Sequence, residues 1–191
     1  MGDRSIENEI YTIGHSSRQL ESFTELLEEN GIELLADVRR FPGSRRYPHF
    51  NAGALNESLS ELGIAYRHFE ALGGRRGKPA DDSPSRGWRV EAFAAYADFM
   101  GTDEFRTALH ELEQEARQRR TAIMCAEAVP WRCHRRLIAD ALTVRGWRVY
   151  DIMDPGKTEP HELTHFARVH DGRLTYPADA DLFDEQDPGA S

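Results

Sequence analysis

One segment of eleven residues, from Cys125 to Arg135, concentrates side chains that can do chemistry. It reads Cys-Ala-Glu-Ala-Val-Pro-Trp-Arg-Cys-His-Arg. A thiol near imidazole or guanidinium groups loses its proton more readily and becomes a nucleophile. Cys125 is therefore the leading candidate nucleophile, with His134 as a base and Glu127 as the carboxylate that orients it.

Two further titratable residues lie earlier in the chain. His15 is a second candidate base, and Asp37 is a second carboxylate that could orient an imidazole. Each also has a structural interpretation, because Asp37 with Arg39 can form a local ion pair and a free cysteine is most often a small buried side chain. The candidate catalytic residues are Cys125, His15, Asp37, Glu127 and His134.

Arginines near these residues favour an anionic ligand, because guanidinium groups bind phosphate or carboxylate through paired hydrogen bonds. Free backbone N–H groups before the last helix would add to such a site. The predicted ligand is a small anion such as a nucleotide or a modified nucleobase, and no cofactor is required. The predicted ligand-binding residues are Ser16, Arg39, Ser44, Arg45, Gly73, Gly74, Cys133 and Arg135. The leading hypothesis is thus a cysteine- or acid/base-dependent hydrolase or transferase.

The alternative is a zinc-binding enzyme. Thiolate and imidazole are the preferred ligands of zinc, and His15, Cys125, Cys133 and His134 form a candidate set. Cys-x-Glu followed by Pro-x-x-Cys is also similar to part of the zinc deaminase signature. The two halves are nearly adjacent here, and the second half lacks its first cysteine.

A second metal pattern is His161-Glu-Leu-Thr-His165, which fits the zincin helix motif letter for letter. Three specified letters are a weak signal in a chain with eight histidines. Pro155, Gly156 and Pro160 precede the pattern, so any helix would be short. The sequence disfavours a metalloprotease.

The third alternative is a non-catalytic binding module built on the segment 74–89. This segment is basic and contains Trp88, so it could hold a nucleotide or a single-stranded end by charge and stacking. A mobile, solvated loop is the competing interpretation.

Hydrophobic periodicity predicts the elements that must position these residues. The expected strands are 9–14, 32–38, 64–69, 121–125 and 147–153, with a late edge strand at 174–176. The expected helices are 17–30, 51–62, 90–100, 102–119 and 131–145. Strands that alternate with helices predict a single-domain three-layer α/β/α fold with a mostly parallel, Rossmann-like sheet. We expect this domain to span 9–177, with an N-terminal tail over 1–8 and an acidic disordered tail over 178–191.

In such sheets ligands bind at the carboxyl ends of the strands. Four of the predicted strands are followed by polar or glycine-rich candidates: His15-Ser16, the 37–45 segment, Gly73-Gly74 and the Cys125–Arg135 segment. We therefore expect these segments to meet at one edge of the sheet.

The overall composition limits the partners. The net charge is −9, which disfavours non-specific binding to duplex nucleic acid. Four arginines within 39–46 favour a small anion over a large polyanion. The two cysteines do not form a disulfide framework, and no apolar run reaches the ~18 residues of a membrane span. We expect a cytoplasmic protein without a membrane partner, and the sequence gives no signal for an oligomeric state.

Several motifs together resemble a known family. They are Tyr-Thr-Ile-Gly-His-Ser at 11–16, Asp-Val-Arg-Arg-Phe-Pro-Gly-Ser-Arg at 37–45, Leu-Gly-Gly at 72–74, Cys-Ala-Glu at 125–127 and Cys-His-Arg at 133–135. In this order, over Tyr11 to about Tyr176, they are similar to the family of domain of unknown function 488. The resemblance implies an α/β fold and a shared site, and no reaction. Tyr150-Asp-Ile-Met153 departs from the pattern, which would have a histidine there.

Overall fold

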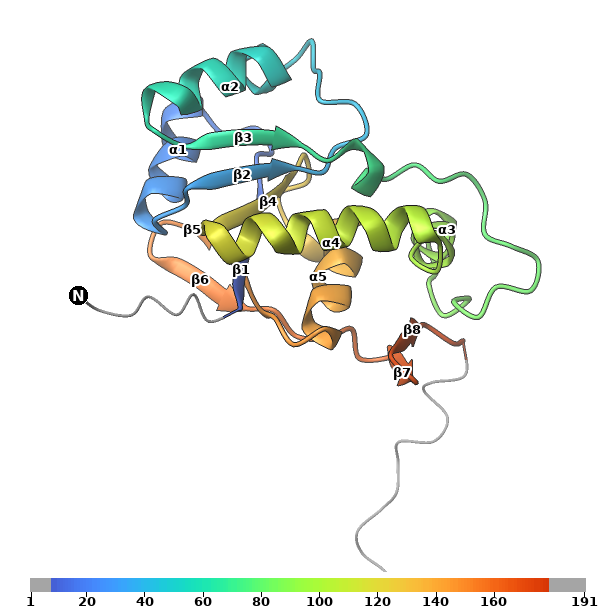
Figure 1. Cartoon of the computed structure of the whole chain (residues 1–191). Helices are drawn as coiled ribbons and strands as arrows, with labels where there is room; N and C mark the ends of the chain where they lie inside the picture. Colours follow the sequence, from blue (N-terminus) through green and yellow to red (C-terminus); the bar gives the residue numbers. More distant parts are fainter. Residues whose placement is uncertain (1–7, 179–191) are drawn as a thin grey trace, which may run out of the picture.

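The computed structural model describes residues 8–178 and is organised around a six-stranded sheet (Figure 1). The strand order is β3-β2-β4-β1-β5-β6. The first five strands are parallel, and β6 pairs antiparallel with β5. The bounds are β1 Glu9–Gly14, β2 Leu34–Asp37, β3 Ala65–His68, β4 Thr121–Cys125, β5 Arg148–Asp154 and β6 Lys157–Pro160.

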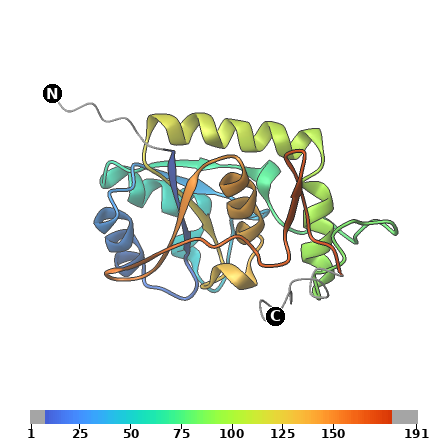
Figure 2. The same cartoon turned by 90° about the horizontal axis from the view of Figure 1, so that it is seen from below.

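Five α-helices in the described residues cover the two faces of the sheet (Figures 1 and 2). One hydrophobic cluster joins α1 and α2 to the sheet, and a second joins α3, α4 and α5 to the opposite face. The helices are α1 Leu20–Glu29, α2 Ala52–Glu61, α3 Glu91–Phe99, α4 Asp103–Gln118 and α5 Arg135–Val144. The predicted α/β fold with a mostly parallel sheet is therefore confirmed.

The central strands have the composition that burial on both faces requires. Every residue of β4 and of β2 is buried. Thr121 is the polar exception in β4, and its hydroxyl donates to the Arg119 carbonyl. Edge strand β3 is only partly buried along its length. The burial pattern thus places β4 at the centre of the sheet, with its carboxyl end inside the molecule.

The chain path opens a crevice above β4. This strand lies between β2 and β1, whose following helices α2 and α1 cover one face. The helix that follows β4, α5, packs on the other face. Chains that leave adjacent strands toward opposite faces separate at the carboxyl edge and leave room for a ligand. Cys125 ends β4 at this point.

At the C-terminal end one predicted strand was wrong and one strand was missed. The expected edge strand at 174–176 is instead β8 Arg173–Thr175, which pairs with β7 Arg168–His170 in a separate two-stranded sheet. The real edge strand, β6, was missed because its sequence Lys-Thr-Glu-Pro is polar and ends in proline, a composition typical of edges. The zincin pattern at 161–165 forms no helix.

The predicted tails over 1–8 and 178–191 lie outside the described residues, apart from Asn8 and Ala178. Within the described part, none of the helices is long and apolar enough to span a membrane.

Candidate functional site

A pocket of about 380 Å³ lies at the carboxyl end of β4. Its floor contains Cys125, Cys133 and His134, and aromatic and basic side chains form its walls. The lining residues are Arg39, Arg40, Phe41, Gly74, Arg75, Ala92, Phe93, Tyr96, Cys125, Ala126, Glu127, Arg132, Cys133 and His134. The structure thus brings together the Cys125–His134 segment, the start of the 37–45 segment and Gly74, as the strand order predicts.

Backbone hydrogen bonds between β1 and β4 continue past the ends of these two strands and position Cys125. The N–H of His15 donates to the Cys125 carbonyl at 3.0 Å, and the N–H of Ser16 donates to the Ala126 carbonyl at 2.9 Å. Ser16 adopts a left-handed backbone, with φ of 51°. The strand end and the first residue of the following turn are therefore fixed to the β1 side of the crevice.

Cys133 and His134 are placed by the turn into α5. The short 3-10 helix η3, Pro130–Arg132, ends where the Cys133 N–H donates to the Pro130 carbonyl at 2.9 Å. The Nε2 of His134 lies 3.0 Å from the Val38 carbonyl, so Nε2 carries the proton and donates. The other ring nitrogen, Nδ1, lies 3.8 Å from the sulfur of Cys125 and 3.8 Å from the sulfur of Cys133.

The two thiols differ in acidity. The hydrogen bond from Cys133 holds the pKa of Cys125 well below its usual range, and His134 acts in the same direction against the effect of burial. Burial, together with that same hydrogen bond, raises the pKa of Cys133 well above its usual range. Both cysteines are free and buried.

Two arginines predicted as anion ligands have internal roles instead. Arg39 is 5% exposed, and its guanidinium bonds both carboxylate oxygens of Asp37, at 2.6 Å for the shortest contact, and the Phe50 carbonyl. Arg135 is 1% exposed and donates to the carbonyls of Glu127 and Ala128. Arg135 does not line this pocket, and it holds the turn after Cys125 in place.

Three arginines that the sequence interpretation missed line the pocket: Arg40, Arg75 and Arg132. Arg75 and Arg132 are exposed, and the Arg75 guanidinium lies 5.8 Å from the ring centroid of Phe41. Phe41 itself is 65% exposed. Arg75 and Arg132 each adjoin a motif already recognised, and Arg40 lies inside the 37–45 motif, which was the available signal.

His15 belongs neither to the cluster of Cys125, Cys133 and His134 nor to the pocket lining. Its Nδ1 bonds the Ser16 carbonyl at 2.9 Å, so Nε2 is free to accept from Arg39 at 3.3 Å. Burial is the largest cause that lowers the pKa of His15, and the neighbouring Arg39 adds to it. A neutral His15 stacked on Phe50, with ring centroids 4.3 Å apart, fits this environment.

The remaining predicted residues divide between the pocket and its surroundings. Glu127 is exposed and lines the pocket. Gly74 approaches His134 so closely that an added Cβ would lie 3.1 Å from Nδ1. Gly73 packs on the Arg40 backbone, where an added Cβ would lie at 2.7 Å. Ser44 supports its own loop by accepting from the Tyr47 N–H, and Arg45 is exposed outside the pocket lining.

Comparison with known proteins identifies the family. Residues 19–142 match the family described as domain of unknown function DUF488. The chain belongs to this family. The match contains the whole Cys125–Arg135 segment and the 37–45 segment, whereas His15 and Ser16 precede it. No curated protein and no solved structure matches this DUF488 chain.

The 74–89 segment of the DUF488 chain is anchored along its length. Ser83 donates to Asp98 at 2.6 Å, and the Gly87 N–H donates to the Tyr176 carbonyl at 2.8 Å. The Trp88 ring packs among Phe93, Phe166 and Tyr176, with centroid distances of 5.2, 4.9 and 5.1 Å. A ring held in this cluster gives little support to base stacking by Trp88.

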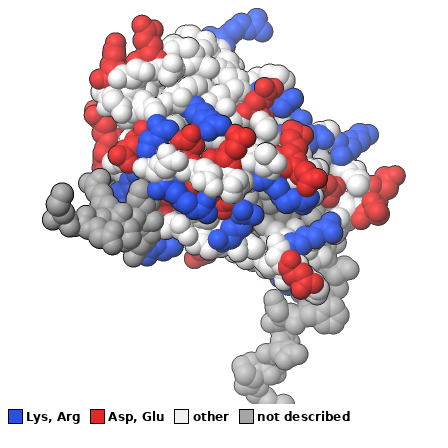
Figure 3. Space-filling model, in the orientation of Figure 1, with Lys and Arg blue, Asp and Glu red and all other residues white. Residues whose placement is uncertain are grey.

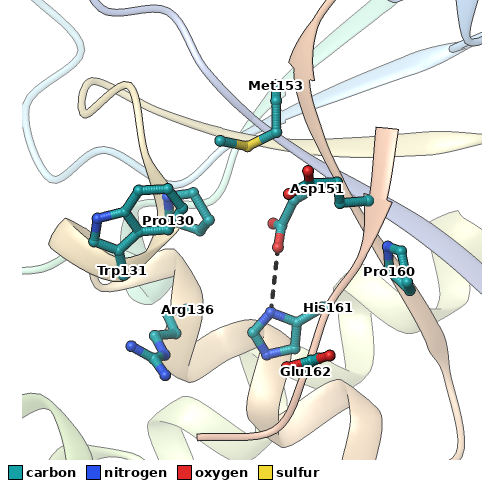
Figure 4. A pocket seen from close by; sticks show the side chains of 9 residues that line it. Pro130, Trp131, Arg136, Asp151, Met153, Pro160, His161 and Glu162 are labelled. Carbon is teal, nitrogen blue, oxygen red and sulfur yellow. Dashed lines mark hydrogen bonds and ion pairs between the residues drawn. The ribbon is translucent and has the colours of Figure 1, made fainter. Parts of the chain in front are cut away.

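A second pocket, of about 430 Å³, lies between η3, β5 and β6 (Figure 4). His161 lies at its wall between two carboxylates, 2.8 Å from Asp140 and 3.4 Å from Asp151. Asp151 also accepts from Thr12, which in turn accepts from Arg135 at 3.3 Å. The first histidine of the zincin pattern is thus part of a buried ion-pair network, while His165 is exposed.

The stability of this DUF488 domain is expected to fall as pH rises from about 6.5 to 9. Hydrogen bonds and charges of Asp140 and Asp151 outweigh burial and raise the pKa of His161 to about 9. A raised pKa adds stability that is complete below the unfolded value near 6.5 and is lost on passing through 9. The contribution is on the order of 3 kcal/mol.

Urea unfolding at a series of pH values measures this effect, with His161→Gln as the comparison. The groups that face His161 are Asp140 on α5, Asp151 on β5, nearby Arg136 and Glu162 at the pocket wall, and Tyr176, whose hydroxyl donates to Asp140. The variant should show a much flatter profile. Equal slopes in both proteins would contradict the assignment.

Proposed function

We propose that this DUF488 protein is a hydrolase that acts on a small anionic substrate bound in the pocket above β4. The Cys125–Cys133–His134 cluster is the reacting centre, and Arg40, Arg75 and Arg132 bind the anionic group. The observation that carries this proposal is the arrangement itself: exposed guanidinium groups surround a pocket whose floor is a thiol–thiol–imidazole cluster.

The size and lining of the pocket support a small ligand. Pockets for small molecules combine apolar walls with a few convergent polar groups, and about 380 Å³ is at the lower end of their range. Phe41, Phe93 and Tyr96 supply the apolar surface.

The surface charge supports a small anion over a nucleic acid. On the face shown in Figure 3, basic and acidic side chains are interspersed, with no continuous basic stripe. A nucleic-acid backbone requires a row of positive charges to follow. The net charge of −9 acts in the same direction.

Replacing Arg75 and Arg132 together by glutamine is expected to weaken anion binding about tenfold or more, because each charge-assisted hydrogen bond contributes roughly 1.5–3 kcal/mol. Titration with inorganic phosphate and with a nucleoside monophosphate at low salt measures the effect. Arg45→Gln is the control, since Arg45 is also an exposed arginine but does not line the pocket. Equal binding by the double variant and the wild type would refute the anion site.

The reaction is tested with a panel of phosphate and carboxylate esters and nucleotides. Cys125→Ser is expected to abolish turnover of any ester that the wild type hydrolyses, with circular dichroism unchanged. A Cys125→Ser protein that retains full activity would remove the cluster from the reaction.

A further inference from the structure

We propose that Cys125, Cys133 and His134 hold a zinc ion whose fourth coordination position faces the pocket. The inference deepens the proposed function, on which its catalytic part rests, by changing the role of Cys125 from nucleophile to metal ligand. It rests on four features of the described residues: ligand type, ligand spacing, the imidazole tautomer and the contacts that surround the ligands.

The spacing fits tetrahedral zinc. The two sulfurs and the Nδ1 of His134 all lie within 4.8 Å of one another, and each sulfur is 3.8 Å from Nδ1. Tetrahedral bonds of about 2.3 Å to sulfur and 2.0–2.1 Å to nitrogen place those atoms roughly 3.6 Å apart. The two sulfur–nitrogen distances of 3.8 Å are therefore only about 0.2 Å longer than tetrahedral zinc requires.

The tautomer of His134 is the one that a metal requires. Because Nε2 donates to the Val38 carbonyl, the lone pair of Nδ1 is directed at the two sulfurs. A ligating histidine ordinarily donates its other N–H to a carbonyl or carboxylate, which fixes the ring and strengthens the ligand. Val38 directly follows β2 and is far from His134 in sequence, so this hydrogen bond forms only in the folded protein.

Other contacts fit a metal-bound thiolate. The backbone N–H of Arg135 donates to the Cys133 sulfur at 3.5 Å, a bond that stabilises negative charge there. The Tyr96 ring packs on His134 with centroids 5.1 Å apart. Two thiolates also balance the charge of a divalent ion, which makes the burial of both cysteines favourable.

The ligand set points to zinc and to an open site. Thiolate and imidazole select zinc among abundant divalent ions. Within the described residues, no fourth Cys, His, Asp or Glu ligand atom joins the three, so the fourth position belongs to water or substrate. Three protein ligands with water in the fourth position are typical of catalytic zinc.

Zinc lowers the pKa of its bound water to about 7, which makes a nucleophile available at neutral pH. In the proposed step the water gives one proton to the Glu127 carboxylate and its oxygen bonds to the electrophilic centre of the substrate. The bond to the leaving group breaks, and the leaving group takes that proton. The sum is addition of one water across the cleaved bond, with no oxidation or reduction.

Metal analysis of the full chain tests the inference directly. Protein purified without chelator and without metal-affinity resin should contain one zinc per chain. Chelator-stripped wild type should take up cobalt and show the intense visible absorption of a tetrahedral site together with a thiolate charge-transfer band. Absence of zinc in the purified protein and of cobalt uptake would overturn the proposal.

Variants assign the ligands. Cys133→Ser and His134→Gln should each lower zinc content at least tenfold, while His165→Ala, an exposed histidine of the zincin pattern, should retain one zinc. Near-native circular dichroism identifies variants that are folded. If a folded Cys133→Ser protein keeps full zinc content, the assignment is wrong.

The outcomes separate this inference from the proposed function. If the protein binds phosphate and hydrolyses esters without zinc, the proposed hydrolase function stands and Cys125 is the nucleophile. Stoichiometric zinc without anion binding or hydrolysis would support the metal site and refute the proposed substrate class.

Discussion

Replacing Asp140 by alanine is expected to destabilise the protein by about 3–5 kcal/mol, the usual cost of leaving a buried ion pair without one partner. Asp140 is fully buried. It accepts from His161 at 2.8 Å, from the Thr164 hydroxyl at 2.7 Å and from the Tyr176 hydroxyl at 2.8 Å. One carboxylate on α5 therefore fixes much of the chain that follows β6.

Urea unfolding at pH 7 measures the loss, and Asp81→Ala is the control. Asp81 is exposed, so its replacement should change the free energy of unfolding by less than about 0.5 kcal/mol. The Asp140→Ala protein should also lose most of the decline in stability between pH 6.5 and 9, because His161 loses its nearer carboxylate. A loss below 1 kcal/mol would show that the network contributes little.

Replacing Gly14 by alanine is expected to disrupt the candidate site and to destabilise the protein by about 1–3 kcal/mol or more. An added Cβ would lie 1.8 Å from the Glu127 carbonyl oxygen and 2.9 Å from that of Ala128. These are backbone atoms, so the turn between Cys125 and Cys133 must shift by more than an ångström. The three proposed zinc ligands would then no longer converge.

Gly53→Ala is the matched control, because an added Cβ at Gly53 meets nothing within 4 Å. Gly53 lies in helix α2, where alanine is favoured over glycine by up to about 1 kcal/mol. The control should retain zinc and be as stable as the wild type or more so, whereas Gly14→Ala should lose at least tenfold in zinc content. Full zinc content and wild-type stability in Gly14→Ala would contradict this account of the turn.

Most of the fold could be predicted because its strands bury both faces. A run such as Thr121–Cys125 needs no tertiary information to be recognised as a core strand. Edge strand β6 lacks such an apolar run. An edge strand is partly exposed to water, and the charged residues Lys157 and Glu159 suit that exposure. The contacts of His161 could not be predicted for another reason: its partners are Asp140 and Asp151, which only the tertiary fold brings to it.

The sequence could predict that the residues around this pocket lie close together, whereas it could not predict the contacts of the arginines there. Parallel strands bring their carboxyl ends together, so Cys125 and the 37–45 segment had to be neighbours. Arg39 and Arg40 both line the pocket, but Arg39 is buried and bonds Asp37, whereas Arg40 is partly exposed. No sequence pattern distinguishes these two neighbours.

The position of β4 between β1 and β2 also constrains how the chain can fold during synthesis. Adjacent strands are about 4.8 Å apart, so β1 and β2 leave a gap that only β4 fills. A nascent chain that ends before Thr121 holds β1 alone and at most a β2–β3 pair, with unpaired edges prone to aggregation. Truncation before Thr121 should thus give insoluble protein, since the strand that ends in Cys125 is also the one that closes the sheet.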